Sequence, residues 1–210
     1  QVTLWRYVTK IDEEYICKNV FIGKTDVSGM TKEEAVKAVD NTLGDYRNKQ
    51  LVLKVKDQGA DVSIEEMGAE VENIDKLAEK AVGYGKNGSI WSRYQKIHNL
   101  DKKKYVIDES FKVDEAKLRE LIQERAVPLE QKAINASASY NGSGFDLTDE
   151  AEGYTVDVDK SVKKIKNFMN KKWNYEDAEV ELKLDTEEPT IKKADLECLP
   201  DELGSYMTNA

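Results

Sequence analysis

Residues that support catalysis or metal binding are scarce in this chain, which has two cysteines and one histidine in 210 positions. Cys17 and Cys198 lie near opposite ends of the chain and form no CxxC pair, so the sequence does not support a zinc site. His98 lies in a lysine-rich stretch without a second histidine, so neither a Cys/His pair nor a Ser-His-Asp triad is expected. We therefore predict no catalytic residue, no metal and no cofactor. The two cysteines are either isolated thiols or a disulfide that joins the chain ends in an oxidising compartment.

Basic charge and long apolar runs are also scarce. Acidic residues outnumber Lys and Arg by 41 to 32, and the formal net charge is −9. This charge argues against binding to nucleic acid or to an anionic membrane surface, because both need a basic face. No apolar run approaches the roughly 18 residues of a membrane span, and the chain is polar from its start. We expect any targeting segment of the natural protein to lie upstream of Gln1.

Neighbouring acids are present, but their spacing is unsuited to shared acid–base chemistry. The pairs are Glu65-Glu66 and Asp149-Glu150. Adjacent positions on a strand point to opposite faces of the sheet, so the members of each pair are poorly placed to act on one substrate. We therefore predict that this region is not an enzyme.

Residues 20–100 show the pattern of a small α+β unit. After a short apolar strand, "VFIG", Thr31 and Glu34 form a capping box that starts a helix. We expect this helix to end at Gly44 in a left-handed conformation. Alternating apolar residues in "LVLKVK" and the returning "DVSI" predict a hairpin, and Asn73 is placed to cap a second helix.

Residues 101–192 repeat this order. An extended stretch leads to Asp114, which is placed to cap a helix. The phrases "INASASY" and "FDLT" on either side of "NGSG" predict a hairpin in which Tyr140 continues the inward face. Asp157 or Asp159 then caps a long helix, and "AEVELKL" predicts a final strand. The apolar face of the long helix contains Val162, Ile165, Met169 and Trp173.

Both segments read strand, helix, hairpin, helix, which predicts a duplicated unit of about 85 residues. This order predicts an α+β fold, in which helices cover one face of a small, mostly antiparallel sheet. We therefore predict two tandem similar units at 20–100 and 101–192, with a lead-in at 1–19 and a linker at 193–210. The alternative is chance similarity, because acidic helix caps after hairpins are common.

Several phrases of the sequence resemble exported cell-wall proteins of Gram-positive-type bacteria. The stretch "VFIGKTDVSGMTKEEAVKAV" is similar to their opening segment, and "GKNGSI" is similar to a later segment in which Lys86 replaces the usual Arg. The phrases "ASASYNGSGFDL" and "EGYTVD" resemble the peptidoglycan-binding domain that precedes a VanW domain or a YkuD-type L,D-transpeptidase domain. The tail "LGSYMTNA" is similar to the entrance of VanW domains, with Met207 in place of the usual first Thr.

This resemblance implies a non-catalytic, extracytoplasmic module of the cell envelope that binds peptidoglycan. It also implies that the protein is exported or membrane-anchored, with a VanW-like or transpeptidase domain beyond Ala210. The Cys and His motif of a transpeptidase is absent. The alternative function is a spacer or scaffold that positions the C-terminal domain without binding a ligand. We expect a monomer whose partner is peptidoglycan and which binds no nucleic acid.

The segment "SIWSRYQKI" contains the candidate ligand-binding residues Trp91, Arg93 and Tyr94. A glycan site uses aromatic faces beside hydrogen-bonding groups, and these residues lie within four positions. The arginine could also pair with a carboxylate of a stem peptide. Ordinary packing of a linker is the alternative explanation for Trp91 and Tyr94.

Overall fold

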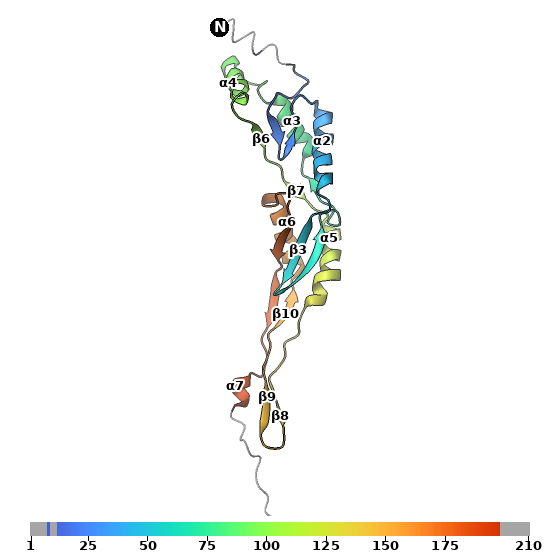
Figure 1. The fold of residues 1–210 in the computed structure, drawn as a ribbon, viewed down its shortest axis with the longest axis vertical. Helices are drawn as coiled ribbons and strands as arrows, with labels where there is room; N and C mark the ends of the chain where they lie inside the picture. The colour runs from blue at the N-terminus through green and yellow to red at the C-terminus, as the bar shows by residue number, and fades with distance from the viewer. Residues whose placement is uncertain (1–7, 9–11, 198–210) are drawn as a thin grey trace, which may run out of the picture.

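The structure, a computed structural model, describes Val8 and residues 12–197. This part of the chain is elongated, with helix α4 near one end and the hairpin β8–β9 near the other (Figure 1). The strands are β1 (Val20–Ile22), β2 (Thr25–Asp26), β3 (Gln50–Val55), β4 (Gln58–Ser63), β5 (Glu70–Val71), β6 (Tyr105–Ile107), β7 (Phe111–Lys112), β8 (Ser137–Tyr140), β9 (Phe145–Thr148), β10 (Gly153–Val156), β11 (Ala178–Glu181) and β12 (Leu184–Glu187). The helices are α2 (Lys32–Asp45), α3 (Ile74–Gly83), α4 (Ile90–Leu100), α5 (Glu115–Leu121), α6 (Val158–Lys171) and α7 (Lys193–Leu196), with the π-helical η1 (Ile122–Ala126) and the 3-10 helix η2 (Val127–Leu129) after α5.

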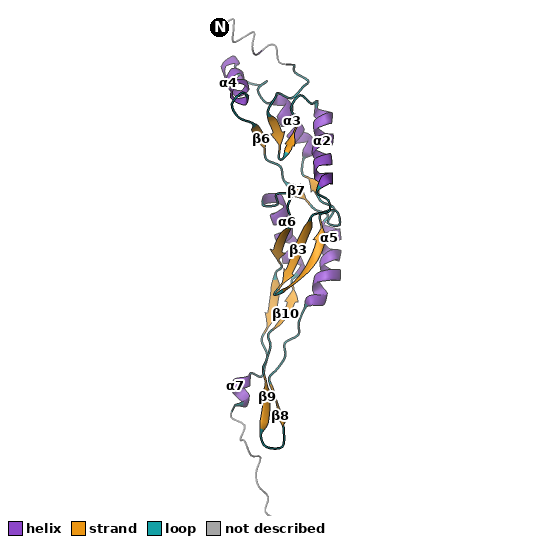
Figure 2. Ribbon diagram, in the orientation of Figure 1, coloured by secondary structure: helices purple, strands orange, loops and turns teal. Residues whose placement is uncertain are grey.

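The α+β class is confirmed, because small sheets and helices alternate along the molecule (Figure 2). Two sheets have three strands, in the orders β2-β1-β6 and β11-β3-β4, and the pairs β5-β7, β10-β12 and β8-β9 complete the set in the described residues. β1 pairs with β6 in parallel, with Val20 opposite Tyr105. β3 pairs with β11 in parallel, with Leu51 opposite Ala178. The segments 20–100 and 101–192 therefore contribute to shared sheets, and the proposed duplication stays a prediction.

Helix α2 forms at the predicted capping box. The Thr31 hydroxyl accepts a hydrogen bond from the Glu34 N–H at 3.3 Å, and the Glu34 carboxylate accepts one from the Thr31 N–H at 2.9 Å. The expected end at Gly44 is wrong, because the helix continues to Asp45 and Gly44 is not among the residues with positive φ. The helix buries Ala35, Val39 and Leu43 on one face. Continuing the helix past Leu43 keeps that last apolar side chain in the core.

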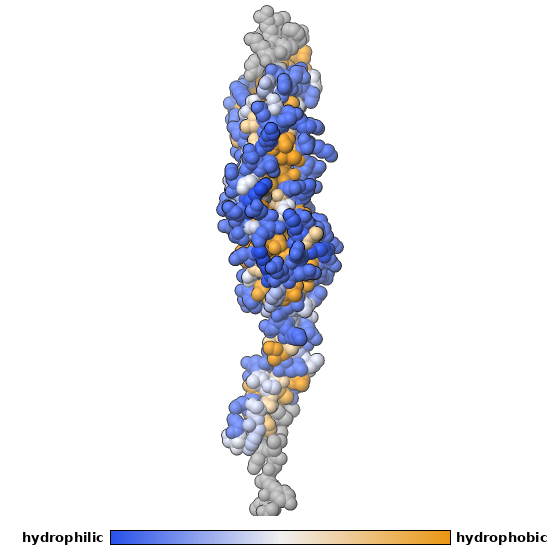
Figure 3. All heavy atoms as spheres, turned by 90° about the vertical axis from the view of Figure 1, so that its right-hand side faces the viewer, coloured by the Kyte–Doolittle hydropathy of each residue, from blue (hydrophilic) through white to orange (hydrophobic). Residues whose placement is uncertain are grey.

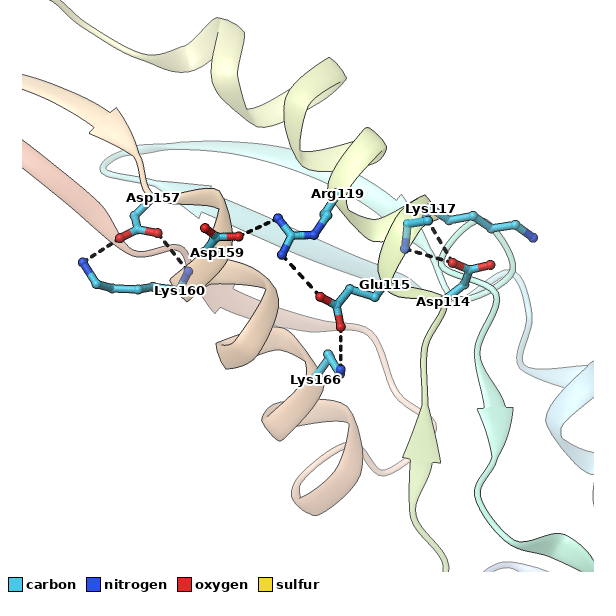
Figure 4. Close-up of polar contacts among 9 residues, drawn as sticks. Asp114, Glu115, Lys117, Arg119, Asp157, Asp159, Lys160 and Lys166 are labelled. Atoms are coloured by element: carbon cyan, nitrogen blue, oxygen red, sulfur yellow. Dashed lines mark hydrogen bonds and ion pairs between the residues drawn. The ribbon is translucent and has the colours of Figure 1, made fainter.

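Helices α5 and α6 start at predicted caps and pack against each other. Asp114 accepts hydrogen bonds from two backbone N–H groups of α5, and Asp157 accepts one from the Lys160 N–H. Ion pairs bridge the exposed edges of the two helices (Figure 4). Arg119 lies 2.6 Å from Asp159 and 3.3 Å from Glu115. Such exposed pairs contribute little to stability, so the buried faces of the two helices hold them together.

The core is one contiguous cluster that runs through both segments of the chain. It includes Leu51 and Leu53 of β3, Val180 of β11 and Ile165 of α6. The surrounding surface is mostly hydrophilic, with hydrophobic patches along the body (Figure 3). Among the described residues, no helix combines the length and the apolar character that a membrane crossing needs.

The hairpin β8–β9 turns at the predicted Asn-Gly sequence. The Asn141 side-chain oxygen accepts hydrogen bonds from the N–H groups of Ser143 and Gly144, and Gly142 has a φ of +97°. The prediction that Tyr140 faces a core is wrong, because its side chain is 57% exposed. The hairpin β3–β4 pairs with β11 and contacts η1, whereas β8–β9 is a sheet of its own that contacts the short α7.

Candidate ligand-binding site on helix α4

Helix α4 carries the candidate residues, although the sequence analysis treated this stretch as a linker. It starts at Ser89, whose hydroxyl accepts a hydrogen bond from the Ser92 N–H at 3.3 Å. Ile97 and Leu100 are buried and attach the helix to the body of the molecule. The Asn19 side-chain amide donates to the Leu100 carbonyl at 2.8 Å and ties the end of the helix to β1.

Three rings form a row along α4, which we name the aromatic ladder: Trp91, Tyr94 and His98. The Trp91 and Tyr94 ring centroids lie 5.9 Å apart, and those of Tyr94 and His98 lie 5.6 Å apart with the planes inclined by 4°. Spacings of three and four positions place these residues on the same helical face. Trp91 is 59% exposed and is the most exposed large hydrophobic residue of the described chain. Tyr94 and His98 are half-buried, so Trp91 is the member of the ladder that presents most of its ring to a ligand.

His98 is a member of this row that the sequence analysis missed. From the sequence, His98 is noted only as a single histidine in a lysine-rich stretch, without a catalytic partner. The spacing of four positions from Tyr94 was the signal that could have revealed it, once α4 was recognised as a helix. Its Nδ1 atom lies 3.7 Å from the Asp101 carboxylate, which also pairs with Lys18 at 2.5 Å.

Arg93 makes contacts that differ from those expected. Its guanidinium donates a hydrogen bond to the Val8 carbonyl at 3.4 Å and lies 4.0 Å from the Glu13 carboxylate. The side chain is 19% exposed, and its buried Nε has no partner. Arg93 thus holds the N-terminal segment, and Trp91 is the candidate whose side chain is most exposed.

Lys86 has a similar structural role. Its ammonium group donates to the carbonyls of Glu13 and Tyr15 at 2.9 Å and 2.6 Å, and the residue is 7% exposed. Burial lowers the pKa of this amine from its ordinary value, while nearby acids and Cys17 oppose the shift. Lys86 therefore holds the N-terminal segment in place through these two hydrogen bonds. Cys17 forms no disulfide with a described residue, and the predicted alternative of a bond to Cys198 lies outside the described residues.

The stretch around α4 is basic, in contrast to the chain as a whole. Residues 86–104 contain six Lys and Arg residues and one acid, Asp101. Lys96 and Lys104 lie over the rings of Tyr84 and Phe21, at 5.9 Å and 5.1 Å from the centroids. The exposed Lys102 and Lys103 have no ion pair among the described residues. The net charge of −9 therefore does not describe this end of the molecule.

The acid pairs singled out in the sequence have structural partners. Glu66 forms an ion pair with Arg125 and also accepts from the Ser63 N–H at 2.8 Å. The arginine and this N–H lower the pKa of Glu66 to about 2. Asp149 pairs with Lys193 at 2.6 Å, and Glu150 accepts from the Lys193 backbone N–H. Within residues 8 and 12–197, no group of three or more His, Cys, Asp or Glu side chains is arranged to hold a metal ion.

A buried carboxyl group lies elsewhere, beside Tyr175, whose ring also contacts Phe111 and Trp173. The Tyr175 hydroxyl donates to one oxygen of Glu109, whose other oxygen is buried without a partner. Burial raises the pKa of Glu109, and burial together with this contact raises the pKa of Tyr175. A side chain at Gly23 would collide with the Glu109 carboxyl group, because a Cβ there would lie 1.6 Å from it. This closely packed arrangement is a structural contact between the turn after β1, the loop between β6 and β7, and the segment between α6 and β11.

A shallow hollow of about 370 Å³ lies beside β10 and β12. It is lined by Glu130, Gln131, Lys132, Tyr154, Thr155, Asp185, Thr186 and Glu187. Tyr154 is its only aromatic residue, and that ring is 8% exposed and lies under the Lys56 ammonium at 5.7 Å. The hollow therefore lacks an open aromatic face of the kind that α4 provides.

Comparison with known families places the α4 site in context. The model of the family described as "Putative peptidoglycan binding domain" matches residues 60–178, which is more than half of the chain. The chain belongs to this family. The matched range of the peptidoglycan-binding family includes α4, the hairpin β8–β9 and α6, and it excludes β1 and β3. No curated protein and no solved structure gives a significant match.

Proposed function

We propose that this protein is a non-catalytic, extracytoplasmic module that binds peptidoglycan through the aromatic ladder of α4. The observation that carries the proposal is a row of rings, with Trp91 exposed and Tyr94 and His98 half-buried, within the matched range of the family. Aromatic rings bury a large area at low conformational cost, and a flat ring face suits the apolar face of a sugar ring. Gln95 and Asn99 on the same helix offer hydrogen-bonding groups beside the rings.

The wider context of the module rests on the sequence resemblance. The tail "LGSYMTNA" supports a VanW-like domain downstream, although these residues lie outside the described part. We place the module in the cell envelope as an exported or membrane-anchored monomer. We also propose that residues 20–100 and 101–192 are two similar α+β units, whose strands pair with one another in shared sheets.

Co-sedimentation with purified wall sacculi tests the proposal. We expect wild type to co-sediment and Trp91→Ala to bind roughly tenfold more weakly, which corresponds to about 1.4 kcal/mol. Tyr140→Ala is a matched control, because Tyr140 is 57% exposed and lies at the opposite end of the molecule. Equal binding by Trp91→Ala and wild type would remove the ladder from the site.

The second candidate function is a spacer that positions a C-terminal domain without binding a ligand. The elongated shape of the described residues favours it, because α4 and α7 lie near opposite ends (Figure 1). A spacer predicts no co-sedimentation of wild type with sacculi at high protein concentration. The same experiment therefore separates the two functions.

A further inference from the structure

The end of α4 has a feature that stacking on sugar rings does not use. Backbone N–H groups of Lys102 and Lys103 both donate to the Asn99 carbonyl at 3.0 Å, so the helical turn continues beyond Leu100. Lys102 follows His98 by four positions and thus lies next to the ladder on the same face. Both lysines are exposed, and neither has an ion pair among the described residues.

Lysines without an ion pair also occur at the end of α6, where the exposed Lys171 and Lys172 have none among the described residues, whereas Lys32, Lys49 and Lys166 pair with carboxylates. Lys102 and Lys103 differ from Lys171 and Lys172 because they follow the row of aromatic rings on α4. An exposed lysine group with no acidic partner creates a local positive potential that attracts anions. Cations near a helix C-terminus also stabilise the helix, so an effect on stability must be measured separately.

We infer that the ligand of α4 is an anionic glycan, whose sugar rings stack on the ladder while its acidic groups pair with Lys102 and Lys103. This inference rests on the proposed function. The acidic groups are either carboxylates of stem peptides or phosphates of wall polymers, which share the same pairing chemistry with lysine. Arg93 and Lys86 are excluded from this role because they bind carbonyls of the N-terminal segment.

An anionic lipid surface is a different partner that lysines could attract. An interfacial helix needs several large apolar residues on its exposed face. On α4, Ile90 and Trp91 are the exposed large apolar residues, at 48% and 59%, whereas Ile97 and Leu100 are buried in the protein. Two such residues at one end of the helix are fewer than an interfacial helix uses, which favours the glycan.

Co-sedimentation with sacculi at increasing NaCl concentration tests the inference. We expect wild-type binding to weaken as salt increases, because screening reduces the attraction between exposed charges. Lys102→Gln/Lys103→Gln should bind several-fold more weakly at low salt and lose most of the salt dependence. Lys171→Gln/Lys172→Gln is the matched control, because it removes two adjacent exposed lysines from the end of α6. The control should bind as wild type does.

Two further ligands identify the source of the acidic groups. Acid treatment removes phosphate polymers from sacculi. If stem-peptide carboxylates pair with the lysines, the treated sacculi should still bind the protein in a salt-sensitive way. If phosphates pair with the lysines, this salt-sensitive binding should be lost. A neutral chito-oligosaccharide should bind with little salt dependence and should still require Trp91. Either result for the stripped sacculi supports an anionic glycan.

The outcomes separate this inference from the proposed function. Sacculi binding that needs Trp91 but is indifferent to salt and to the Lys102→Gln/Lys103→Gln change would overturn the inference and leave the proposed function. Absence of binding to sacculi at every salt concentration would overturn both. Stronger binding to anionic phospholipid vesicles than to sacculi, lost in the lysine variant, would replace the glycan with a membrane. A melting temperature equal to wild type shows that the lysine variant remains folded.

Discussion

Replacing Ile165 by Ala tests whether the apolar face of α6 supports the shared core. Ile165 is completely buried in the contiguous hydrophobic cluster. The substitution removes three carbon groups at about 0.8 kcal/mol each. The cavity left behind adds about 1 kcal/mol, and the higher helix propensity of Ala returns about 0.4 kcal/mol. We therefore expect the free energy of unfolding to fall by about 3 kcal/mol.

Urea unfolding, followed by circular dichroism and by tryptophan fluorescence, measures this loss. Trp173 is 6% exposed and follows α6 directly, so its emission reports on the same region. The midpoint should fall while the dependence on urea stays unchanged, because the unfolded surface is nearly the same. Ile165→Val should lose only about 0.5–1.5 kcal/mol.

Lys163→Ala is the matched control on the same helix, because Lys163 is exposed and an exposed substitution changes stability by about 0.5 kcal/mol or less. An Ile165→Ala protein as stable as Lys163→Ala would refute the assignment of this face to the core. A broad or two-step transition would instead show that α6 unfolds separately from the rest.

Three further predictions concern a cap, an ion pair and the shared sheets. Thr31→Ala should lower the free energy of unfolding by about 1 kcal/mol through loss of the capping box, and Thr31→Ser should retain most of the wild-type value. The lowered pKa of Glu66 means that its pair with Arg125 stabilises the fold above about pH 4.5. That contribution should disappear as the pH falls toward about 2, so Glu66→Gln and wild type should differ in stability at pH 6 and converge at pH 2. A polypeptide of residues 12–104 should show no cooperative unfolding transition, because β3 lacks β11 and β1 lacks β6; a sharp melt would contradict this.

Local signals in the sequence predicted much of the secondary structure. The caps at Thr31, Asp114 and Asp157 were correct because a capping bond forms between residues two or three positions apart. The end of α2 was not predicted correctly, because packing of Leu43 determines it more strongly than the preference of Gly44 for a left-handed cap. Asn73 starts α3 in a left-handed conformation without a side-chain cap bond, so a plausible cap residue does not ensure a cap.

Long-range strand pairing was beyond the reach of the sequence analysis. Nothing within the segment at Val20 indicates that its partner lies at Tyr105, and nothing within β3 indicates β11. Both pairings join strands separated by many residues, and their register depends on the assembled core. The exposure of Tyr140 was not predicted for the same reason, because burial also depends on contacts with distant elements. Its alternation with apolar neighbours indicated a buried face, but no further strand pairs with β8–β9 in the described residues.

The candidate site was predicted in part from composition and in part missed. Trp91 and Tyr94 were named because aromatic residues suit a glycan, and they do lie side by side on α4. The direction of Arg93 could not be predicted, because its contact with Val8 joins residues that are distant in the sequence. The lysines were overlooked because the charge was averaged over the whole chain.

The uneven charge has a consequence for how the protein approaches a negatively charged wall. Residues 86–104 carry a positive excess, so the rest of the chain is more acidic than the net charge of −9 indicates. In an elongated molecule with α4 near one end, the acidic body is repelled by anionic polymers while the α4 end is attracted (Figure 1). This arrangement favours encounters in which α4 arrives first, and it keeps the body from adhering along its length. Neutralising Lys102 and Lys103 would therefore remove the attraction that brings α4 to the wall first, as well as the ion pairs in the bound state. The association rate constant should fall by a larger factor than the dissociation rate constant rises.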